Sequence, residues 1–123
     1  MNLNLSAWLN AFRLRTLPLA FSSIITGVFA AYSTQFDWLT LVLTLTTTLL
    51  LQVLSNLAND YGDSEKGTDN DQRIGPKRAI QAGLLSFDEI KKGIFIATAL
   101  AFGFGLWLVY HALGSQWQIL FFI

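Results

Sequence analysis

Polar side chains with the chemistry of a metal and phosphate site gather in one stretch of the sequence. Five of them follow at i, i+4, i+7, i+8 and i+11, which is the spacing of a single helix face: Gln52, Asn56, Asn59, Asp60 and Asp63. The amides begin inside an apolar segment and the carboxylates come at its end. Polar groups at membrane depth are costly, so they normally face a cavity or the interior of a bundle. The pattern therefore predicts a functional face.

Asp60 and Asp63 lie three residues apart, a spacing that suits a hard divalent cation. Mg²⁺ prefers oxygen ligands and commonly binds one or two carboxylates together with waters and substrate phosphates. Guanidinium groups bind phosphate oxygens bidentately and Lys adds a point charge. The segment that follows supplies such cations: Lys66, Arg73, Lys77 and Arg78. Carboxylates beside these cations predict a site for Mg²⁺ and a diphosphate.

Alternative interpretations explain only part of this pattern. Loops between membrane spans are often charged, and Glu65, Asp69 and Asp71 taken singly fit solvated loop charges. That interpretation does not account for amides inside an apolar helix. A phosphate-binding loop of the GxxxxGK[ST] type is missing from the sequence. The single histidine, His111, falls on the other side of the predicted membrane, so we expect no Ser-His-Asp site and no role for it here.

The composition indicates a polytopic membrane protein. The chain has 123 residues, of which 53% are hydrophobic and 13% charged, whereas soluble domains average about 25% charged residues. The net charge is zero, so no basic surface points to a nucleic-acid partner. The absence of Cys excludes disulfides, thiolate metal sites and Cys nucleophiles within this sequence.

Apolar runs predict an all-α bundle with three full spans and the start of a fourth. The spans are Leu17–Tyr32, Phe36–Ala58 and about Ile90–Tyr110, with Trp117–Ile123 opening the fourth. Before them, Leu3–Arg15 fits an amphipathic surface helix whose apolar positions have helical spacing: Leu5, Trp8, Leu9 and Phe12.

Local signals mark the third span. Ser86 and Glu89 fit a capping box at its start. Small residues recur every four positions along it and predict close packing against another helix: Gly93, Ala97, Ala101 and Gly105.

Basic residues set the predicted orientation in the lipid bilayer. All eight Lys and Arg lie in Arg13–Arg15 or Lys66–Lys92, and the two other turns have none. By the positive-inside rule, the N-terminus and the Asp60–Lys92 loop are cytoplasmic, as in a bacterial inner-membrane protein. Aromatic residues fall at the opposite face, as an interfacial belt would place them: Tyr32, Trp38, Tyr110 and Trp117.

Several strings resemble the UbiA superfamily of intramembrane prenyltransferases. Residues 59–63 (NDYGD) are similar to its first Asp-rich motif, NDxxD. Residues 56–63, 66–69 (KGTD), 73–76 (RIGP) and 78–79 resemble the branch that prenylates 1,4-dihydroxy-2-naphthoate in menaquinone biosynthesis, and Gln81, Gly83 and Leu84 extend the resemblance. Residues 13–18 (RLRTLP) resemble the usual start of the family's first helix. Asp69 follows Asp63 at a longer spacing than most of the superfamily has, a feature similar to the naphthoate branch.

This resemblance implies a bundle in which two Asp-rich segments hold Mg²⁺ and a polyprenyl diphosphate. It implies that Asp60 and Asp63 are catalytic metal ligands, with Asp69 a third ligand. Residues implied to bind the diphosphate are Asn56, Asn59, Arg73, Lys77 and Arg78. Residues 1–123 would be the N-terminal portion of one prenyltransferase domain, inactive until further spans or a partner chain supply the second motif.

Two other functions stay open from the sequence. One is prenyl transfer to a different aromatic acceptor. The other is a cation transporter or channel subunit in which Asp60 and Asp63 bind the transported ion. A transporter should carry polar residues at the midplane of several spans, but the first and third predicted spans have no ionisable residue.

Overall fold

The computed structural model describes residues 4–31, 36–67, 72, 78–114 and 116, and over these residues it is helical without strands. Its elements are α1 (Leu5–Phe12), a short 3₁₀ helix η1 (Leu14–Thr16), α2 (Leu17–Ala30), α3 (Trp38–Glu65) and α4 (Phe87–Leu113). The predicted all-α class is confirmed. Of the described helices, α3 with 28 residues and α4 with 27 are long and apolar enough to cross a membrane.

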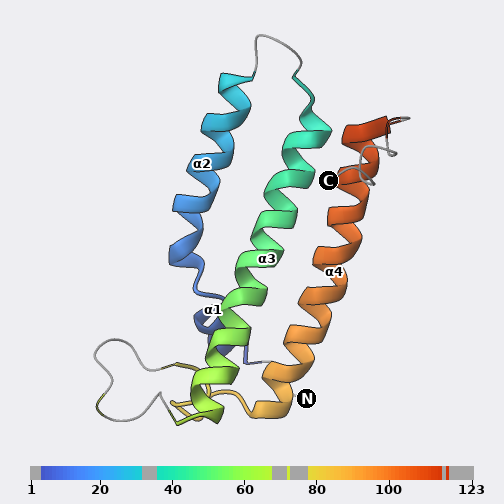
Figure 1. The fold of residues 1–123 in the computed structure, drawn as a ribbon. Coiled ribbons are helices and arrows are strands. Elements are labelled where there is room, and N and C mark those ends of the chain that lie inside the picture. Colours follow the sequence, from blue (N-terminus) through green and yellow to red (C-terminus); the bar gives the residue numbers. More distant parts are fainter. Residues whose placement is uncertain (1–3, 32–35, 68–71, 73–77, 115, 117–123) are drawn as a thin grey trace.

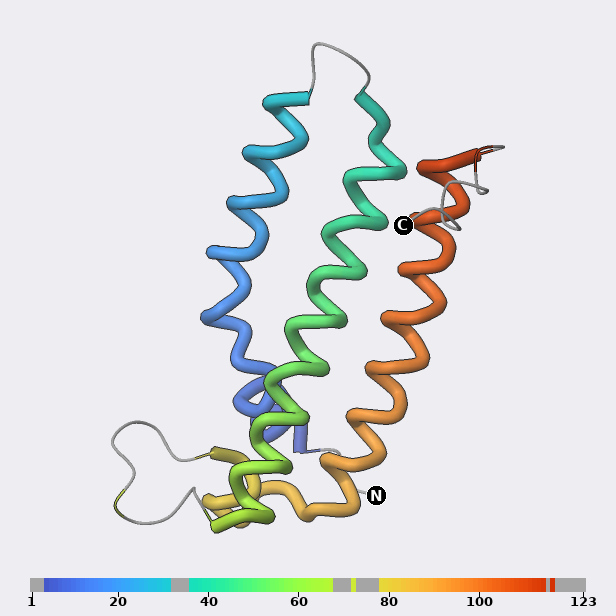
Figure 2. Tube along the Cα trace, in the orientation of Figure 1, coloured from blue at the N-terminus to red at the C-terminus, as the bar shows by residue number. Residues whose placement is uncertain are grey.

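The three long helices lie side by side, with α3 between α2 and α4 (Figures 1 and 2). α2 has 14 described helical residues, which is about 21 Å at 1.5 Å per residue. Tyr32 and the predicted fourth span lie outside the described residues. The short α1 lies near the end of the bundle where α3 ends and α4 begins. We call this the carboxylate end, because Asp60 and Asp63 lie there.

Small residues on α4 form its contact with α3, as the sequence predicted. Ala97 and Ala101 are 6% and 5% exposed. A Cβ added to Gly105 would lie 3.7 Å from Cγ2 of Thr47 on α3, and one added to Gly93 would lie 3.4 Å from Cδ1 of Leu57. Membrane helices have little hydrophobic drive to associate with one another, so close backbone approach at such residues supplies much of the packing.

The predicted capping box at the start of α4 is confirmed. The Ser86 hydroxyl oxygen accepts a hydrogen bond from the Glu89 backbone N–H at 3.2 Å, and the Glu89 carboxylate accepts one from the Ser86 N–H at 2.8 Å. These contacts satisfy donors that the first helical turn leaves free. Pro18 lies in the first turn of α2, where a residue without a backbone N–H is tolerated. Thr16 precedes that helix, but its hydroxyl donates to the Arg13 carbonyl and makes no side-chain cap.

The N-terminal helix is shorter than predicted, and its alanine residues pack against the bundle. Asn4 caps its start by accepting from the Ala7 N–H at 3.2 Å, and Arg13 ends it with a left-handed backbone at φ 51°. The buried residues are Ala7 and Ala11, at 0% and 2% exposed.

Two residues of the predicted apolar face, Leu5 and Leu9, point away from the bundle. Leu5 and Leu9 are 68% and 43% exposed. Small residues allow the close approach of helices, so the alanine face packs inward and the leucines are left for the surroundings.

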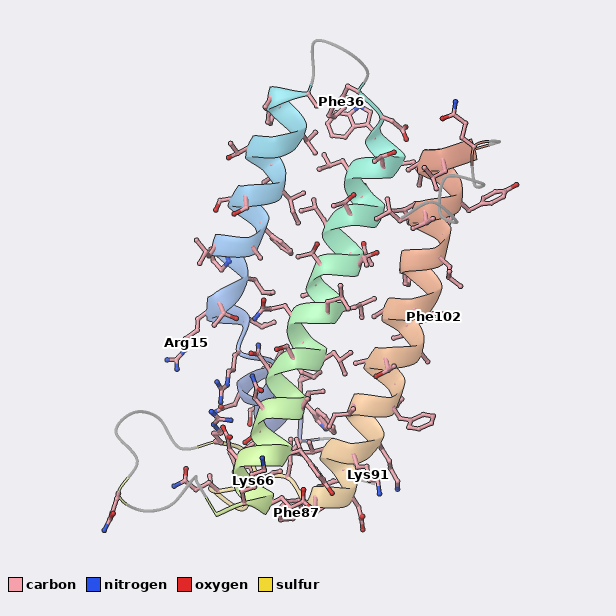
Figure 3. The ribbon with its side chains drawn as sticks, in the orientation of Figure 1. Arg15, Phe36, Lys66, Phe87, Lys91 and Phe102 are labelled. Atoms are coloured by element: carbon pink, nitrogen blue, oxygen red, sulfur yellow. The ribbon has the colours of Figure 1, made fainter. Side chains whose placement is uncertain are left out.

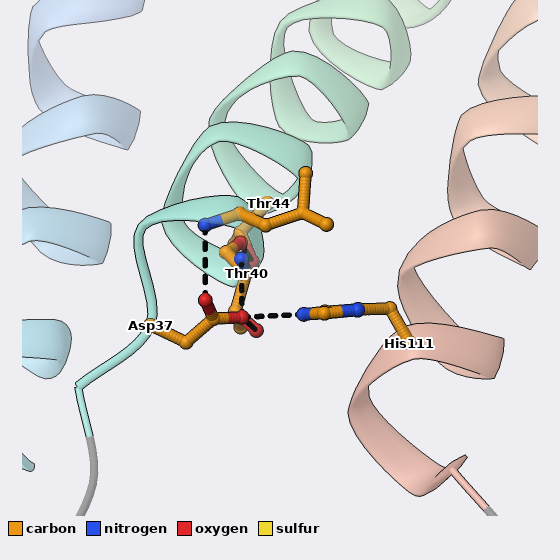
Figure 4. Close-up of polar contacts among 5 residues, drawn as sticks. Asp37, Thr40, Thr44 and His111 are labelled. Atoms are coloured by element: carbon orange, nitrogen blue, oxygen red, sulfur yellow. Dashed lines mark hydrogen bonds and ion pairs between the residues drawn. The ribbon is translucent and has the colours of Figure 1, made fainter.

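A polar contact joins α3 and α4 at the end of the bundle opposite the carboxylate end (Figure 4). Asp37 caps α3 by accepting from the Thr40 N–H at 3.0 Å and from the Thr40 hydroxyl at 2.7 Å. His111 Nε2 contacts the same carboxylate from the last turn of α4. Hydrogen bonds hold the pKa of Asp37 below its ordinary value. The largest effect comes from the Thr40 hydroxyl, and His111 and the backbone N–H groups add to it. His111 therefore lies at the end of the bundle away from the predicted metal site, and it links α3 to α4, a role that the sequence did not predict.

Candidate metal and diphosphate site

The last turns of α3 carry the predicted polar face, and most of it points inward. α3 runs without interruption to Glu65, so both carboxylates belong to the helix and not to a loop. Asn56 is 6% exposed and Asp60 is 1% exposed, while Asp63 is half-buried. Asn59 is exposed, so it lies at the edge of this face.

Arg78 is brought to α3 by a compact turn that the sequence analysis did not describe. The Leu84 N–H donates to the Ala79 carbonyl at 2.9 Å, and the Gly83 N–H donates to the Ile80 carbonyl at 2.9 Å. Gly83 has φ 71°, so the pattern is a Schellman motif with glycine at the left-handed position. Ala79 and Leu85, at 1% and 4% exposed, anchor this turn in the core.

The turn places Arg78 against a carboxylate of α3. A guanidinium nitrogen of Arg78 lies 2.6 Å from a carboxylate oxygen of Asp63, and the two side chains are 10% and 37% exposed. The pair unites a predicted metal ligand with a predicted diphosphate ligand that lies fifteen residues further along the chain. A carboxylate and a guanidinium therefore meet at the place where the sequence predicts that Mg²⁺ and a diphosphate bind.

Asn56 has a partner that the sequence analysis missed. Its side-chain Nδ2 donates to the backbone carbonyl of Phe12 at 2.9 Å, across 44 positions of sequence. Phe12 is the last residue of α1, and the last carbonyls of a helix have no partner within the helix. A carbonyl can only accept, so this contact fixes which end of the Asn56 amide faces α1. The earlier expectation gave Asn56 a role toward carboxylates or phosphate, and nothing in the sequence pointed to α1.

Packing around the carboxylate end holds these groups in place. A core of α1, α3, α4 and the turn after Arg78 contains Ala7, Ala11, Val53, Leu57, Ala79, Leu85 and Ile90. The ring of Tyr61, between the two carboxylates in sequence, meets the ring of Phe87 edge to face at 5.5 Å between centroids. This contact ties the end of α3 to the start of α4.

An apolar groove of about 510 Å³ lies between α1, α3 and α4. Its walls include Trp8, Leu50 and Leu100, and none of the predicted site residues lines it. It is therefore a feature of how α1 packs and not part of the polar site.

The donor set fits part of a Mg²⁺ site. Within the described part of the chain, no group of three or more acidic or histidine side chains could hold a metal ion. Asp60 and Asp63 supply two carboxylates from one helix face, and Mg²⁺ commonly completes such a set with waters and phosphate oxygens. Asp69, Arg73 and Lys77 lie outside the described residues.

Basic residues and two exposed aromatic residues lie toward opposite ends of the bundle. Lys66 and Lys91 lie at the carboxylate end, and Arg15 lies in the same half (Figure 3). Trp38 and Tyr110 lie at the other ends of α3 and α4 and are 71% and 73% exposed.

The chain is similar to proteins of known name. The model of the UbiA prenyltransferase family matches residues 20–123. The chain is 46% identical over 112 residues to the 1,4-dihydroxy-2-naphthoate octaprenyltransferase of Haemophilus influenzae, a match that covers 89% of this chain and 36% of that protein. It is 49% identical over 104 residues to the Escherichia coli protein of the same name, covering 84% of this chain and 34% of that protein.

A more distant relative is the protein of that name from Mycobacterium tuberculosis, 34% identical over 113 residues, a match that covers 91% of this chain and 38% of that protein. No solved structure matched the chain. The chain thus spans about a third of the length of these relatives. Since the family match extends over most of the sequence and includes both apolar helices long enough to span a bilayer, the chain is an integral membrane protein that belongs to the UbiA prenyltransferase family.

Proposed function

We propose that this chain forms part of an enzyme that transfers a polyprenyl group from its diphosphate to 1,4-dihydroxy-2-naphthoate in menaquinone biosynthesis. The observation that carries the proposal is the meeting of Asp63 and Arg78 at 2.6 Å beside the buried Asp60. The relatives named for this reaction, at 46% and 49% identity, support the choice of acceptor.

The residues have separate roles in the proposed reaction. Asp60 and Asp63, with Asp69, would hold Mg²⁺, which when bound neutralises charge on the diphosphate leaving group. Arg78, with Arg73 and Lys77, would bind the diphosphate oxygens, because guanidinium and ammonium groups stabilise the charge that develops there. Asn56 and Asn59 would orient these groups or bind a phosphate oxygen.

Arg78 has two possible partners in this scheme. Without substrate it pairs with Asp63. A diphosphate offers the guanidinium a second anion that it can bind bidentately. A cation bound to Asp63 would neutralise that carboxylate in place of Arg78. The Arg78 side chain would therefore turn from the carboxylate toward the phosphate when both ligands are present. The surrounding apolar helices exclude water, which strengthens these contacts and protects a reactive allylic centre.

We further propose that the carboxylate end faces the cytoplasm in a bacterial inner membrane. The basic residues Arg15, Lys66 and Lys91 at that end and the exposed Trp38 and Tyr110 at the other support this orientation. The acceptor and the diphosphate would then be taken from the cytoplasmic side.

The test uses the full-length gene product in membranes. Asp60→Asn and Asp63→Asn should each abolish formation of prenylated naphthoate, while expression and membrane insertion persist. Lys91→Ala is the matched control, because Lys91 is an exposed charge at the same end and should keep near wild-type activity. Substantial product from both Asp variants would refute the metal assignment.

The same membranes separate the other candidate functions. If the product is a different prenylated aromatic compound, the acceptor is not 1,4-dihydroxy-2-naphthoate. Uptake of a radiolabelled cation into vesicles would support a transporter, and the enzyme proposal predicts none.

A further inference from the structure

The N-terminal helix α1 makes two specific contacts that point to a role beyond surface attachment. The match to the family covers residues 20–123, so α1 at Leu5–Phe12 lies outside it. One contact is the hydrogen bond from Asn56 to the Phe12 carbonyl. The other is the contact between the Trp8 indole and Gly93 of α4.

Trp8 lies directly over Gly93, where no side chain could be added without moving the indole. A Cβ on Gly93 would lie 2.7 Å from Cζ3 and 2.8 Å from Cη2 of Trp8. Both distances are far shorter than ordinary contact between carbon atoms, about 3.5–4.0 Å. The indole is rigid, so the overlap with an added Cβ can be relieved only if the whole ring moves away from Gly93. Because Gly93 has no side chain, it leaves a space on α4, which we call the notch, that the Trp8 indole occupies.

The residues of α1 beside Trp8 are closely packed, so we expect movement of the indole to displace the helix. Ala7 and Ala11 are 0% and 2% exposed and flank Trp8 on the packed face. The Trp8 and Phe12 rings lie 5.8 Å apart between centroids, one helical turn from each other. A displaced indole would therefore shift the end of α1, where the Phe12 carbonyl meets Asn56.

We propose that α1 is a positioning element of the site, seated by Trp8 on Gly93, and that it sets the orientation of the Asn56 side chain through the Phe12 carbonyl. Asn56 lies one helical turn before Asp60, so its amide orientation determines which group it offers to ligands beside that carboxylate. Trp8 and Gly93 are positioning residues in this scheme and touch no reacting atom. The proposal rests on the proposed function for its kinetic test, but its structural test does not.

The structural test measures whether α1 is docked. The sequence has no Cys, so Ala11→Cys provides a reporter that is buried when α1 is seated. In the full-length protein, made Cys-free outside this position, Gly93→Ala should raise the rate of maleimide labelling at position 11 by about tenfold or more. Gly103→Ala is the matched control, because a Cβ there meets nothing within 4 Å. Exposed Ser6→Cys should label equally fast in all backgrounds.

The kinetic test asks whether the docked helix acts on the diphosphate site. Gly93→Ala should raise the KM for the prenyl diphosphate by about 10- to 100-fold, because small misplacements of binding groups cost that much, and leave the KM for the acceptor unchanged. A merely structural defect would lower the amount of active enzyme and leave both KM values as they are. Trp8→Leu combined with Gly93→Ala should recover part of the loss, since the shorter side chain clears the notch.

A double-mutant cycle identifies the route. If Gly93 acts through Asn56, Gly93→Ala should add little to Asn56→Ala, giving strong non-additivity. Fully additive effects, or unchanged labelling at position 11 in Gly93→Ala, would overturn the proposal. If the wild-type enzyme forms no prenylated naphthoate, the proposed function fails, while the labelling result still decides whether Trp8 seats α1.

Discussion

Replacing Asn56 with Leu isolates the hydrogen bond that joins α3 to α1. Leu has the same branching and number of side-chain heavy atoms as Asn, although it is larger, and it cannot donate, so the Phe12 carbonyl, 2.9 Å from Nδ2 in the native structure, would lose its side-chain partner. Asn56 is 6% exposed, so water has little access to restore the bond from that side. Leaving a buried polar group unsatisfied costs about 1–3 kcal/mol. We therefore expect the docked state of α1 to lose that amount of free energy.

The cost converts directly into a labelling rate. At about 1.4 kcal/mol per factor of ten, the open fraction of α1 should rise by about 5- to 150-fold. When reclosing is faster than chemical modification, the labelling rate follows the open population. Maleimide labelling of Ala11→Cys should therefore accelerate by the same factor in Asn56→Leu. The measurement is a time course on the full-length protein at several reagent concentrations, which verifies that the rate stays proportional to reagent.

Gln52→Leu is the control for this prediction. Gln52 precedes Asn56 by one turn on the same helix face and is half-buried, so the substitution makes the same chemical change beside the site. It should leave the labelling rate at position 11 near the wild-type value. Equal acceleration by Gln52→Leu and Asn56→Leu, or none by Asn56→Leu, would refute the reasoning that this one bond holds α1.

Two further predictions concern the ends of the long helices. Because hydrogen bonds from Thr40 and His111 lower the pKa of Asp37, its contribution to stability should be complete above the ordinary Asp range and decline as pH falls below about 4. Thermal unfolding of the full-length protein should show this decline, Asp37→Asn should remove it, and an identical pH profile in that variant would contradict the assignment. Ser86→Ala removes the capping box of α4 and should cost about 1 kcal/mol in unfolding free energy, measured against the exposed-site control Lys91→Ala. A loss in Ser86→Ala no larger than that in Lys91→Ala would count against the cap.

Features encoded by neighbours in sequence were predictable. The capping box at Ser86 needs only residues three apart, and its partners are the predicted ones. The small residues of α4 have a fixed spacing, and Ala97 and Ala101 pack against α3 as expected. Asp60 and Asp63 lie on one continuous helix, as their helix-face spacing predicted, although the orientation argument counted them with the cytoplasmic loop. Each of these outcomes follows from helical geometry alone.

The contacts of α1 could not be predicted in the same way. Hydrophobic periodicity marked Leu5 and Leu9 as part of the apolar face of a surface helix, and both are exposed, but it gave no sign that Ala7 and Ala11 would be buried against the bundle. In a membrane protein the outward face is also apolar, so apolar spacing does not distinguish the bundle interior from the lipid. The size of the side chains distinguishes them, because close helix contacts select small residues.

Pairings between distant residues were also out of reach. Asn56 meets Phe12 across 44 positions and His111 meets Asp37 across 74. In both cases one partner is a group that ends or begins a helix, a backbone carbonyl or a capping carboxylate. The Phe12 carbonyl has no partner within its own helix, and the Asp37 carboxylate keeps acceptor capacity after it has capped α3, so a polar residue on a neighbouring helix can meet either group. The sequence marks which residues are polar but not which helix end will lie beside them.

The position of α1 gives a physical reason for the order of polar residues along α3. A helix C-terminus presents free carbonyls and a partial negative charge. Phe12 brings that end of α1 to α3 one turn before Asp60, where a carboxylate would face a second acceptor and be repelled. An amide at position 56 can donate to the carbonyl with one hydrogen of Nδ2 and keep its other hydrogen and its oxygen for a ligand. The carboxylates come later, beyond α1, where Arg78 offsets the charge of Asp63. An Asn56→Asp variant should therefore undock α1 more than Asn56→Leu does, although it differs from Asn by fewer atoms, and faster labelling at position 11 in the Leu variant would show that charge at this point does not matter.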